Sequence, residues 1–361
     1  MRILDRHVLR EFLVFASIGE VAFVGIYVIV NLFEKIDVFV DNKTPLPLVV
    51  RYYLLGVPLF AVQVLPLSLL LGSLLSLGQL RKWGELTAMQ IAGWAPARIL
   101  APLLVAGLLF SAASLAVAEW VTPETVRKQQ ELFDTEIRGR REGGRGSQSE
   151  VILLGRGGRI YLAHSYDAGS RTMRTISVQH PRPGSQELDW RLDAERGQWT
   201  DEHWMFREGF FRRFVDDREI GTSFRRFADS RLEERPEDFA RPPGDPLYMS
   251  RGDLLYYIRR LREGGGRIHK YEVDYHIRGS FPFSNLVMVL LGGILSLRIR
   301  KGGNIALAVG MTLALGFAYL AFIRVGQALG YHETLPPLLA AWLGNLTFGT
   351  LGAVMLWRAH S

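Results

Sequence analysis

The sequence predicts an α-helical polytopic membrane protein with six transmembrane helices and an all-β domain inserted between the third and the fourth. Long apolar runs occupy both ends of the 361-residue chain, and each run reaches or approaches the roughly 20 residues that a helix needs to cross a bilayer. The middle of the chain holds only short strand-like runs separated by turns. Overall, 48% of the residues are hydrophobic and none is cysteine, which excludes disulfide and thiol chemistry.

The six predicted spans fall into two groups of three. They cover residues 12–32, 54–80, 99–118, 281–297, 305–329 and 335–357. A cleavable signal peptide is the alternative for the first run. That run is long, contains Glu20 and lacks a small-residue cleavage site, so we predict a span.

Two spans carry ridges of small residues that let another helix approach closely, either within this chain or in a second subunit. The ridges are Ser68, Gly72 and Ser76 in the second span, and Ala306, Gly310, Ala314 and Ala318 in the fifth. Pro58 and Pro66 predict kinks in the second span.

The predicted strands cover residues 151–154, 159–163, 174–180, 194–199, 204–214 and 219–227. Short strands at this spacing favour an antiparallel sandwich or an open barrel. A Pro- and Arg-rich connection, 226–246, follows. A capping box at Ser250–Asp253 then starts an amphipathic helix. Its predicted apolar face holds Leu254, Leu255, Ile258 and Leu261, and three glycines at 264–266 end it. The predicted domains are therefore 1–123, 124–249 and 250–361.

The distribution of basic residues predicts the topology. The loops on the side of the termini hold ten, namely Arg2, Arg6, Arg10, Arg81, Lys82, Arg98, Arg298, Arg300, Lys301 and Arg358. The short loops opposite hold Lys35, Lys43 and Arg51. By the positive-inside rule, the termini are cytoplasmic and the β domain lies outside, because long domains translocate regardless of charge.

Residues 81–98, between the second and third spans, form the most charged short segment between two apolar runs. Leu86 and Met89 share a helical face with Gly93, and Trp83 and Trp94 flank the segment as membrane-boundary residues do. We predict a short helix against the membrane that presents Glu85, Thr87 and Gln90 to a soluble partner. The alternative is a surface helix with no partner.

The sequence contains no motif for catalysis, nucleotide binding or metal binding. It lacks a phosphate-binding loop, a zinc-protease motif, a nucleophile elbow and any nucleic-acid-binding motif, and its eight histidines have no ligand spacing. We therefore expect no enzyme activity and no bound cofactor or metal. A net charge of +7 favours anionic partners.

Charged residues near or within the spans are the remaining candidates, since charges are costly there. Lys35, Arg127, Lys128 and Arg324 are the candidate ligands of an anionic lipid headgroup. The alternative is that Arg324 pairs with Glu20 or Glu119 inside the bundle, and that residues at the span ends extend to the interface.

Four sequence stretches carry a resemblance to a known family. They are NLFEKID, GELTAMQIAGW, AEWVTPE and YIRRLREGG, in that order along the chain. Together with the order of the spans, they resemble the LptF/LptG family over essentially the whole chain. This family comprises the permease subunits of the ABC transporter that extracts lipopolysaccharide from the bacterial inner membrane. The YIRRLREGG helix is more similar to the LptG half.

The resemblance implies a partner for residues 81–98. In the family this segment is a coupling helix that docks on the ATPase LptB, which implies coupling roles for Gly84, Glu85, Leu86, Met89 and Gly93. ATP and Mg²⁺ would then bind to a partner ATPase dimer and not to this chain.

The resemblance also implies the other partners and the lipid path. They are an LptF-like second permease, LptC- and LptA-like periplasmic proteins, and lipopolysaccharide, with the inserted domain as a periplasmic β-jellyroll. The first and fifth spans would form lateral gates around a lipid cavity. Basic residues at the outer end of the first span contact lipid A phosphates in the LptG half. Here Asn31 falls where a lysine is often found, and Lys35 lies one turn later.

Two other classes of function stay open. A non-transporting ABC-coupled envelope scaffold would share the coupling helix but would need no lipid-sized cavity. An intramembrane lipid-modifying enzyme would form product without any ATPase.

Overall fold

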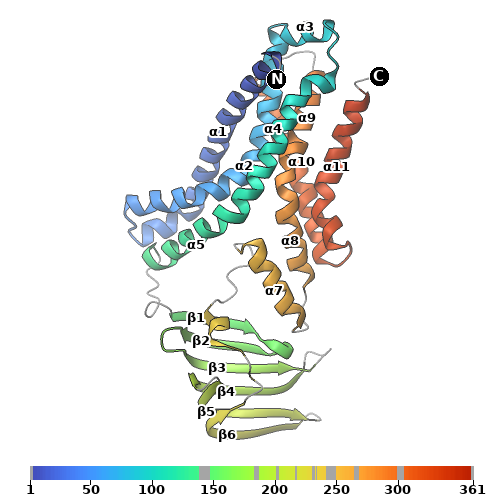
Figure 1. Ribbon diagram of the computed structural model, residues 1–361. Helices are drawn as coiled ribbons and strands as arrows, with labels where there is room; N and C mark the ends of the chain where they lie inside the picture. The colour runs from blue at the N-terminus through green and yellow to red at the C-terminus, as the bar shows by residue number, and fades with distance from the viewer. Residues whose placement is uncertain are drawn as a thin grey trace. The chain divides into compact units, whose positions relative to one another are not determined.

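The computed structural model describes residues 3–137, 147–182, 187–200, 203–215, 218–229, 232, 234–240, 249–263, 268–298 and 305–358. The chain divides into two units. One, mainly helical, comprises Met1–Phe133 and Glu272–Ser361, and the other comprises Asp134–Tyr271. Figure 1 shows both units, coloured along the chain.

The described residues include six helices that are long and apolar enough to cross a membrane, which confirms the predicted multi-pass architecture. Their helical cores are α1 (Ile3–Asp41), α2 (Leu46–Lys82), α4 (Pro96–Ala116), α9 (Ser284–Arg298), α10 (Ile305–Tyr331) and α11 (Pro337–Arg358). Short elements extend two of them. The π-helix η1 (Val117–Val121), α5 (Thr122–Leu132) and a second π-helix, η2 (Phe133–Ile137), continue α4, whereas α8 (His269–Ser280) and η5 (Phe281–Phe283) precede α9.

Helices α2 and α9 form the tightly packed centre of the helical unit. A Cβ atom on Gly72 would lie 2.9 Å from the backbone of Ala16 in α1. A Cβ on Gly292 of α9 would lie 2.9 Å from the carbonyl oxygen of Leu70 in α2. The ridge of Ser68, Gly72 and Ser76 is therefore buried within this chain, as the bundle-packing alternative predicts.

Helices α1 and α10 leave much of their apolar surface exposed. The apolar stretch of α1 is 11% buried, whereas that of the α8–α9 segment is 67% buried. The small residues of the fifth-span ridge are exposed on α10, and nothing lies within 4 Å of a Cβ built on Gly310. A helix that is apolar and unburied in one chain requires lipid or another subunit to cover it.

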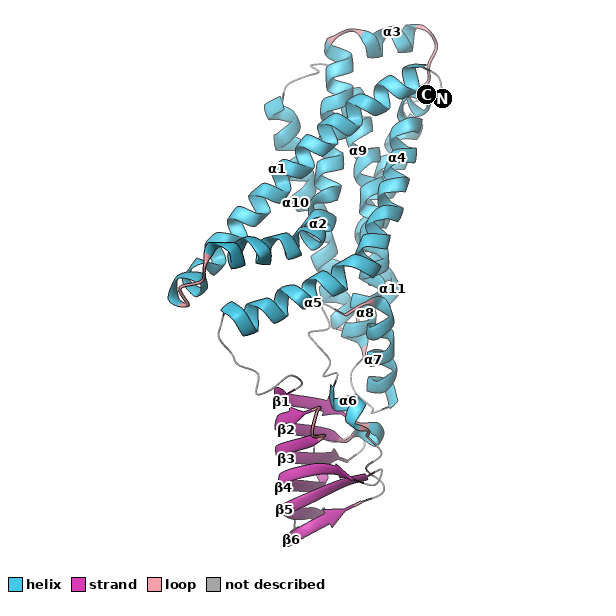
Figure 2. Cartoon of the chain, turned by 60° about the vertical axis from the view of Figure 1, so that its left-hand side comes forward, coloured by secondary structure: helices cyan, strands magenta, loops and turns pink. Residues whose placement is uncertain are grey.

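The inserted unit contains one six-stranded antiparallel sheet, which confirms the predicted β domain (Figure 2). Its strands are β1 (Ser147–Leu154), β2 (Ile160–Asp167), β3 (Thr172–Pro181), β4 (Leu188–Thr200), β5 (His203–Val215) and β6 (Arg218–Ala228). Each strand pairs with its neighbour in sequence, so the described connectivity is a meander. The described strands form a single sheet. They form neither the antiparallel sandwich nor the open barrel that the strand spacing favours.

A line of interrupted pairing crosses this sheet from β2 to β6. In the described strands, the backbone pairing skips one residue on each of five strands, and each skipped residue lies opposite the next. These residues are His164, Thr175, Glu195, Glu208 and Arg225. Thr175 and Glu208 have φ angles of 46° and 53°, a left-handed conformation that is uncommon outside glycine. The register is the same on both sides of this line, so the pairing is interrupted there without an inserted residue.

One face of the sheet carries an aromatic core. Trp204, Phe206 and Tyr161 are fully buried there, and Phe239 from the short helix α6 (Pro236–Ala240) packs against them. The Pro- and Arg-rich connection thus contributes to the core through α6. Glu234 of this connection accepts a hydrogen bond from the Tyr161 hydroxyl and forms an ion pair with Arg159. Burial is the largest cause of a raised pKa of Tyr161, and the neighbouring Glu234 raises this pKa further. The Tyr161 hydroxyl therefore stays protonated and donates the hydrogen bond.

The predicted amphipathic helix is α7 (Arg251–Glu263). The Ser250 Oγ atom accepts a hydrogen bond from the Asp253 amide at 3.1 Å, which confirms the capping box. Leu254, Ile258 and Leu261 are buried as predicted. Leu255 is exposed and so does not belong to that face, because it lies one residue, about 100°, around the helix from Leu254. The glycines at 264–266 lie outside the described residues.

Candidate coupling and lipid-contact sites

The segment between α2 and α4 contains the short helix α3 (Glu85–Ile91). Gly84 precedes it with φ 79°, and Gly93 follows it with φ 83°, so both ends use a conformation that disfavours side chains. Figure 1 shows α3 at the same end of the helical unit as the beginning of α1 and the end of α11. The two glycines allow the chain to leave α2, form less than two full turns across the bundle, and enter α4.

One face of α3 is built into the helical bundle. Leu86 is 0% exposed and Met89 is 5% exposed, and both belong to one core cluster with Val8 and Phe12 of α1. Of the candidate coupling residues, these two therefore hold α3 to the spans. The opposite face is exposed through Thr87, Ala88, Gln90 and Ile91, the last of which is 83% exposed.

A hydrogen bond and an ion pair join α3 and its flank to the start of α1. The His7 Nε2 atom lies 2.8 Å from the Glu85 Oε2 atom. An Arg98 Nη2 atom lies 2.9 Å from the Asp5 Oδ2 atom, and the Arg98 guanidinium lies over the Trp94 ring. His7 and Asp5 cannot be identified from the sequence, because pairs that are 78 and 93 residues apart leave no local pattern.

An aromatic cluster surrounds Lys35 near the other end of α1. The Lys35 ammonium donates a hydrogen bond to the Tyr52 hydroxyl. It lies 4.9 Å from the centroid of the Tyr52 ring and 4.8 Å from that of the Phe133 ring. Phe39 and Tyr53 pack edge-on against the same group. Cation–π attraction therefore stabilises the ammonium, and a phosphate that binds Lys35 would approach over aromatic surface.

The other candidate cations have different neighbours. Arg127 pairs with Glu124 and Glu131 on α5, each at 2.9 Å, and Lys128 pairs with Glu124 at 3.2 Å. Arg324 is exposed on α10 and donates to the neutral Gln327 at 2.9 Å. The interactions described for Arg324 do not include the pairing with Glu20 or Glu119 that was considered as an alternative.

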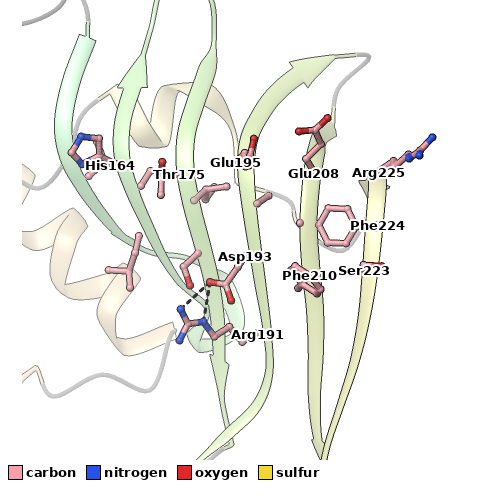
Figure 3. A pocket seen from close by; sticks show the side chains of 17 residues that line it. His164, Thr175, Arg191, Asp193, Glu195, Glu208, Phe210, Ser223, Phe224 and Arg225 are labelled. Atoms are coloured by element: carbon pink, nitrogen blue, oxygen red, sulfur yellow. Dashed lines mark hydrogen bonds and ion pairs between the residues drawn. The ribbon is translucent and has the colours of Figure 1, made fainter.

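A cavity of about 920 Å³ lies against the sheet of the inserted unit. Leu162, Ile176, Phe210 and Phe224 provide apolar surface. Figure 3 shows that the five residues of the interrupted line, from His164 to Arg225, border it on successive strands. Because charged groups border an apolar floor, the groove suits an amphiphile better than a small polar molecule.

A comparison with known protein families identifies a family for this chain. The family model described as "Lipopolysaccharide export system permease LptF/LptG" matches residues 6–358. The chain belongs to the LptF/LptG family. The description of that family names permeases of lipopolysaccharide export.

Individual relatives come from both halves of the family. LptG of Haemophilus influenzae is 22% identical over 366 residues, which cover 98% of this chain and 97% of that protein. LptF of Escherichia coli K12 is 33% identical over 94 residues, and that alignment spans only 26% of each chain. LptF of Shigella flexneri matches to the same extent.

Proposed function

We propose that this chain is the LptG-like permease half of an ABC exporter that extracts lipopolysaccharide from the bacterial inner membrane. A separate LptB-like ATPase dimer drives it, and ATP and Mg²⁺ bind there. The observation that carries the proposal is the geometry of α3, which has one face built into the bundle and the other exposed. Family membership supports lipopolysaccharide as the cargo.

Helix α3 is suited to receive force from a soluble partner. Its inner face is fixed by Leu86 and Met89, so a load on the outer face reaches α1, α2 and α4 through packed side chains. Ile91 and Trp83 expose apolar surface near this face, which is costly in water and favourable against a protein groove. Glu85 supplies the polar contact, while Gly84 and Gly93 provide the sharp turns that place the helix across the end of the bundle.

A second permease completes the membrane part. The exposed faces of α1 and α10 are the surfaces that remain to be covered, and the small ridge on α10 suits a close helix contact. An LptF-like chain that meets this surface encloses a cavity between the two subunits. Lipid enters this cavity from the side.

Basic residues then select an anionic lipid. Among Lys35, Arg127, Lys128 and Arg324, Arg324 is the strongest candidate, because the charge on its guanidinium is not balanced by the neutral Gln327. Glu124 already pairs with Arg127 and Lys128, which lowers their electrostatic attraction for phosphate. Lys35 acts at the outer end of α1 within its aromatic cluster.

ATP binding closes the ATPase dimer, α3 carries that movement to the spans, and the cavity narrows. The lipid moves outward to the inserted β domain, whose amphipathic groove receives it and passes it to LptC- and LptA-like β-domain proteins. In this topology the termini and α3 are cytoplasmic, and the β domain is periplasmic. The positive-inside rule supports this orientation.

Co-purification from native membranes through a tag on this chain tests the proposal. Mass spectrometry should find a P-loop ATPase, a second six-span permease and bound lipopolysaccharide. An ATPase without lipid would favour the envelope scaffold instead. If neither the ATPase nor a second permease is found, the coupling role of α3 is wrong and an intramembrane enzyme must be reconsidered.

A further inference from the structure

We propose that Asp5 and His7 are positioning residues that clamp the cytoplasmic end of the first span to the coupling segment. Through this clamp, α1 moves with α3 as one body. The inference rests on the proposed function, and it assigns a role to two residues at the start of the chain. It follows from a hydrogen bond, an ion pair and the apolar contact between them.

The first pair holds the beginning of α3. His7 lies 2.8 Å from Glu85, which is the first residue of the helix. The helix dipole favours a carboxylate at this position. The Glu85 carboxylate also contacts His7 of α1. Both side chains are about two-fifths exposed, at 39% and 42%, so this contact is weak by itself and the second pair and the apolar contact must add to it.

The second pair holds the segment after α3. Arg98, in the first turn of α4, reaches Asp5 at 2.9 Å, and the Asp5 side chain is only 7% exposed. A carboxylate that is so buried depends on its cationic partner, because loss of the partner leaves an uncompensated charge. Trp94 lies 5.1 Å from the Arg98 guanidinium and limits its movement.

Apolar contact fills the space between the two pairs. Val8, one residue after His7, and Phe12, one turn later, are buried in the cluster that contains Leu86 and Met89. The two polar contacts and this apolar contact fix both the position and the rotation of α3 against α1. A single contact would allow the segment to pivot.

The clamp has a mechanical consequence for α1. This span buries the smallest share of its apolar stretch among the six described spans. Most of its apolar stretch therefore faces away from the other described helices, although Ala16 packs against Gly72 of α2. The α2 helix is a poor lever by comparison, since a Cβ on Gly292 of α9 would meet Ser73 and the Leu70 carbonyl oxygen of α2. Movement of α3 reaches the open side of the permease through Asp5 and His7.

The decisive experiment uses the complete export complex in proteoliposomes and measures ATP hydrolysis and lipopolysaccharide extraction separately. The double variant Asp5→Asn/His7→Ala should lower extraction at least about fivefold, the scale of a coupling free energy, while ATP hydrolysis and co-purification of the ATPase persist. The single variant His7→Lys, which places a hydrogen-bond donor opposite Glu85 and leaves Asp5 unchanged, should extract lipopolysaccharide like the unmodified complex. Arg10→Ala, an exposed neighbour on α1, is the matched control and should behave like the unmodified complex.

A distance measurement separates positioning from simple stabilisation. The chain has no cysteine, so spin labels at Arg6→Cys and Gln90→Cys are specific within it. The distance between them should stay constant between nucleotide-free and ATP-bound complexes, and the Asp5→Asn/His7→Ala background should make it change. Three results would each overturn the clamp. They are unaltered extraction in the double variant, loss of the ATPase from the double variant, and a change in the label distance between the nucleotide-free and ATP-bound forms of the unmodified complex. A complex that hydrolyses ATP but extracts no lipid even without substitutions would instead refute the proposed function.

Discussion

The α2–α9 pair and the helices α1 and α10 differ in how their small residues are used. In α2 and α9, glycine allows backbones to approach so closely that a Cβ atom at position 292 would meet a carbonyl oxygen at 2.9 Å. In α10, Gly310 has open space around it. The same residue type therefore completes the packing in one region and leaves a surface unfinished in the other.

This difference indicates which helices can move. Close packing resists displacement, because interiors tolerate little change in volume. The exposed apolar faces of α1 and α10 have no such restraint from the described part of the chain, although the opposite face of α1 packs against α2. The α2–α9 pair is thus the most rigid part of the helical unit, and the outward faces of α1 and α10 are the surfaces at which movement costs the least packing.

The largest effect should come from Gly292→Val. The new side chain would collide with the backbone of Leu70 and with Ser73, and overpacking of this kind typically costs about 1–3 kcal/mol or more. We expect poor membrane accumulation and a lower thermal unfolding midpoint of the purified chain. A normal midpoint in a fluorescence-detected melting experiment would show that α2 and α9 are not closely packed.

Gly310→Val makes the same substitution on the open face. Because nothing lies near this position, the chain should fold and melt as the unmodified protein does. Pairing with the second permease should fall, as bulk on a small-residue ridge separates two helices. Quantitative co-purification measures this effect. If Gly310→Val lowers the unfolding midpoint as much as Gly292→Val, the contrast between the two regions is wrong.

Arg324→Gln should have a smaller effect, confined to the lipid. Removing an exposed cation from α10 should weaken extraction of lipopolysaccharide severalfold, the scale of one charge-assisted hydrogen bond of about 1.5–3 kcal/mol reduced by solvent. The matched variant Arg127→Gln should change extraction little, since Glu124 and Glu131 already neutralise that guanidinium. Equal losses in both variants would contradict the assignment of Arg324.

Tyr319→Phe should have the smallest effect. The Tyr319 hydroxyl donates to Asn345 Oδ1 at 2.8 Å, and Asn345 donates in turn to the Ser280 carbonyl at 2.7 Å. This chain of hydrogen bonds attaches α10 to α11 and α8. Loss of one buried bond should cost about 1 kcal/mol, visible as a slightly lower unfolding midpoint. An unchanged midpoint would mean that side-chain packing alone holds α10.

Local patterns predicted the elements of the fold well. Apolar length predicted all six spans, and each of the six predicted strand runs overlaps a strand of the sheet. Both signals depend on neighbouring residues, which a single sequence contains. The capping box at Ser250 was predicted for the same reason.

The sequence could not predict features that depend on residues distant along the chain. The partners of Glu85 and Arg98 are in the first ten residues, and the interrupted line across the sheet requires the register of five strands. The burial of Glu234 by the sheet also escaped prediction, because its segment is rich in proline and arginine. Likewise, helical spacing placed Leu86 and Met89 on one face without showing which helices that face contacts.

The central claim is that α3 couples a partner ATPase to lipid movement, and Glu85→Ala tests it most directly. In the reconstituted complex, extraction of lipopolysaccharide and ATP hydrolysis are measured side by side, with Glu11→Ala on α1 as the matched carboxylate control. We predict that Glu85→Ala lowers extraction at least about fivefold while the complex stays assembled and hydrolyses ATP, and that Glu11→Ala changes neither. Full extraction by an intact Glu85→Ala complex would contradict the account.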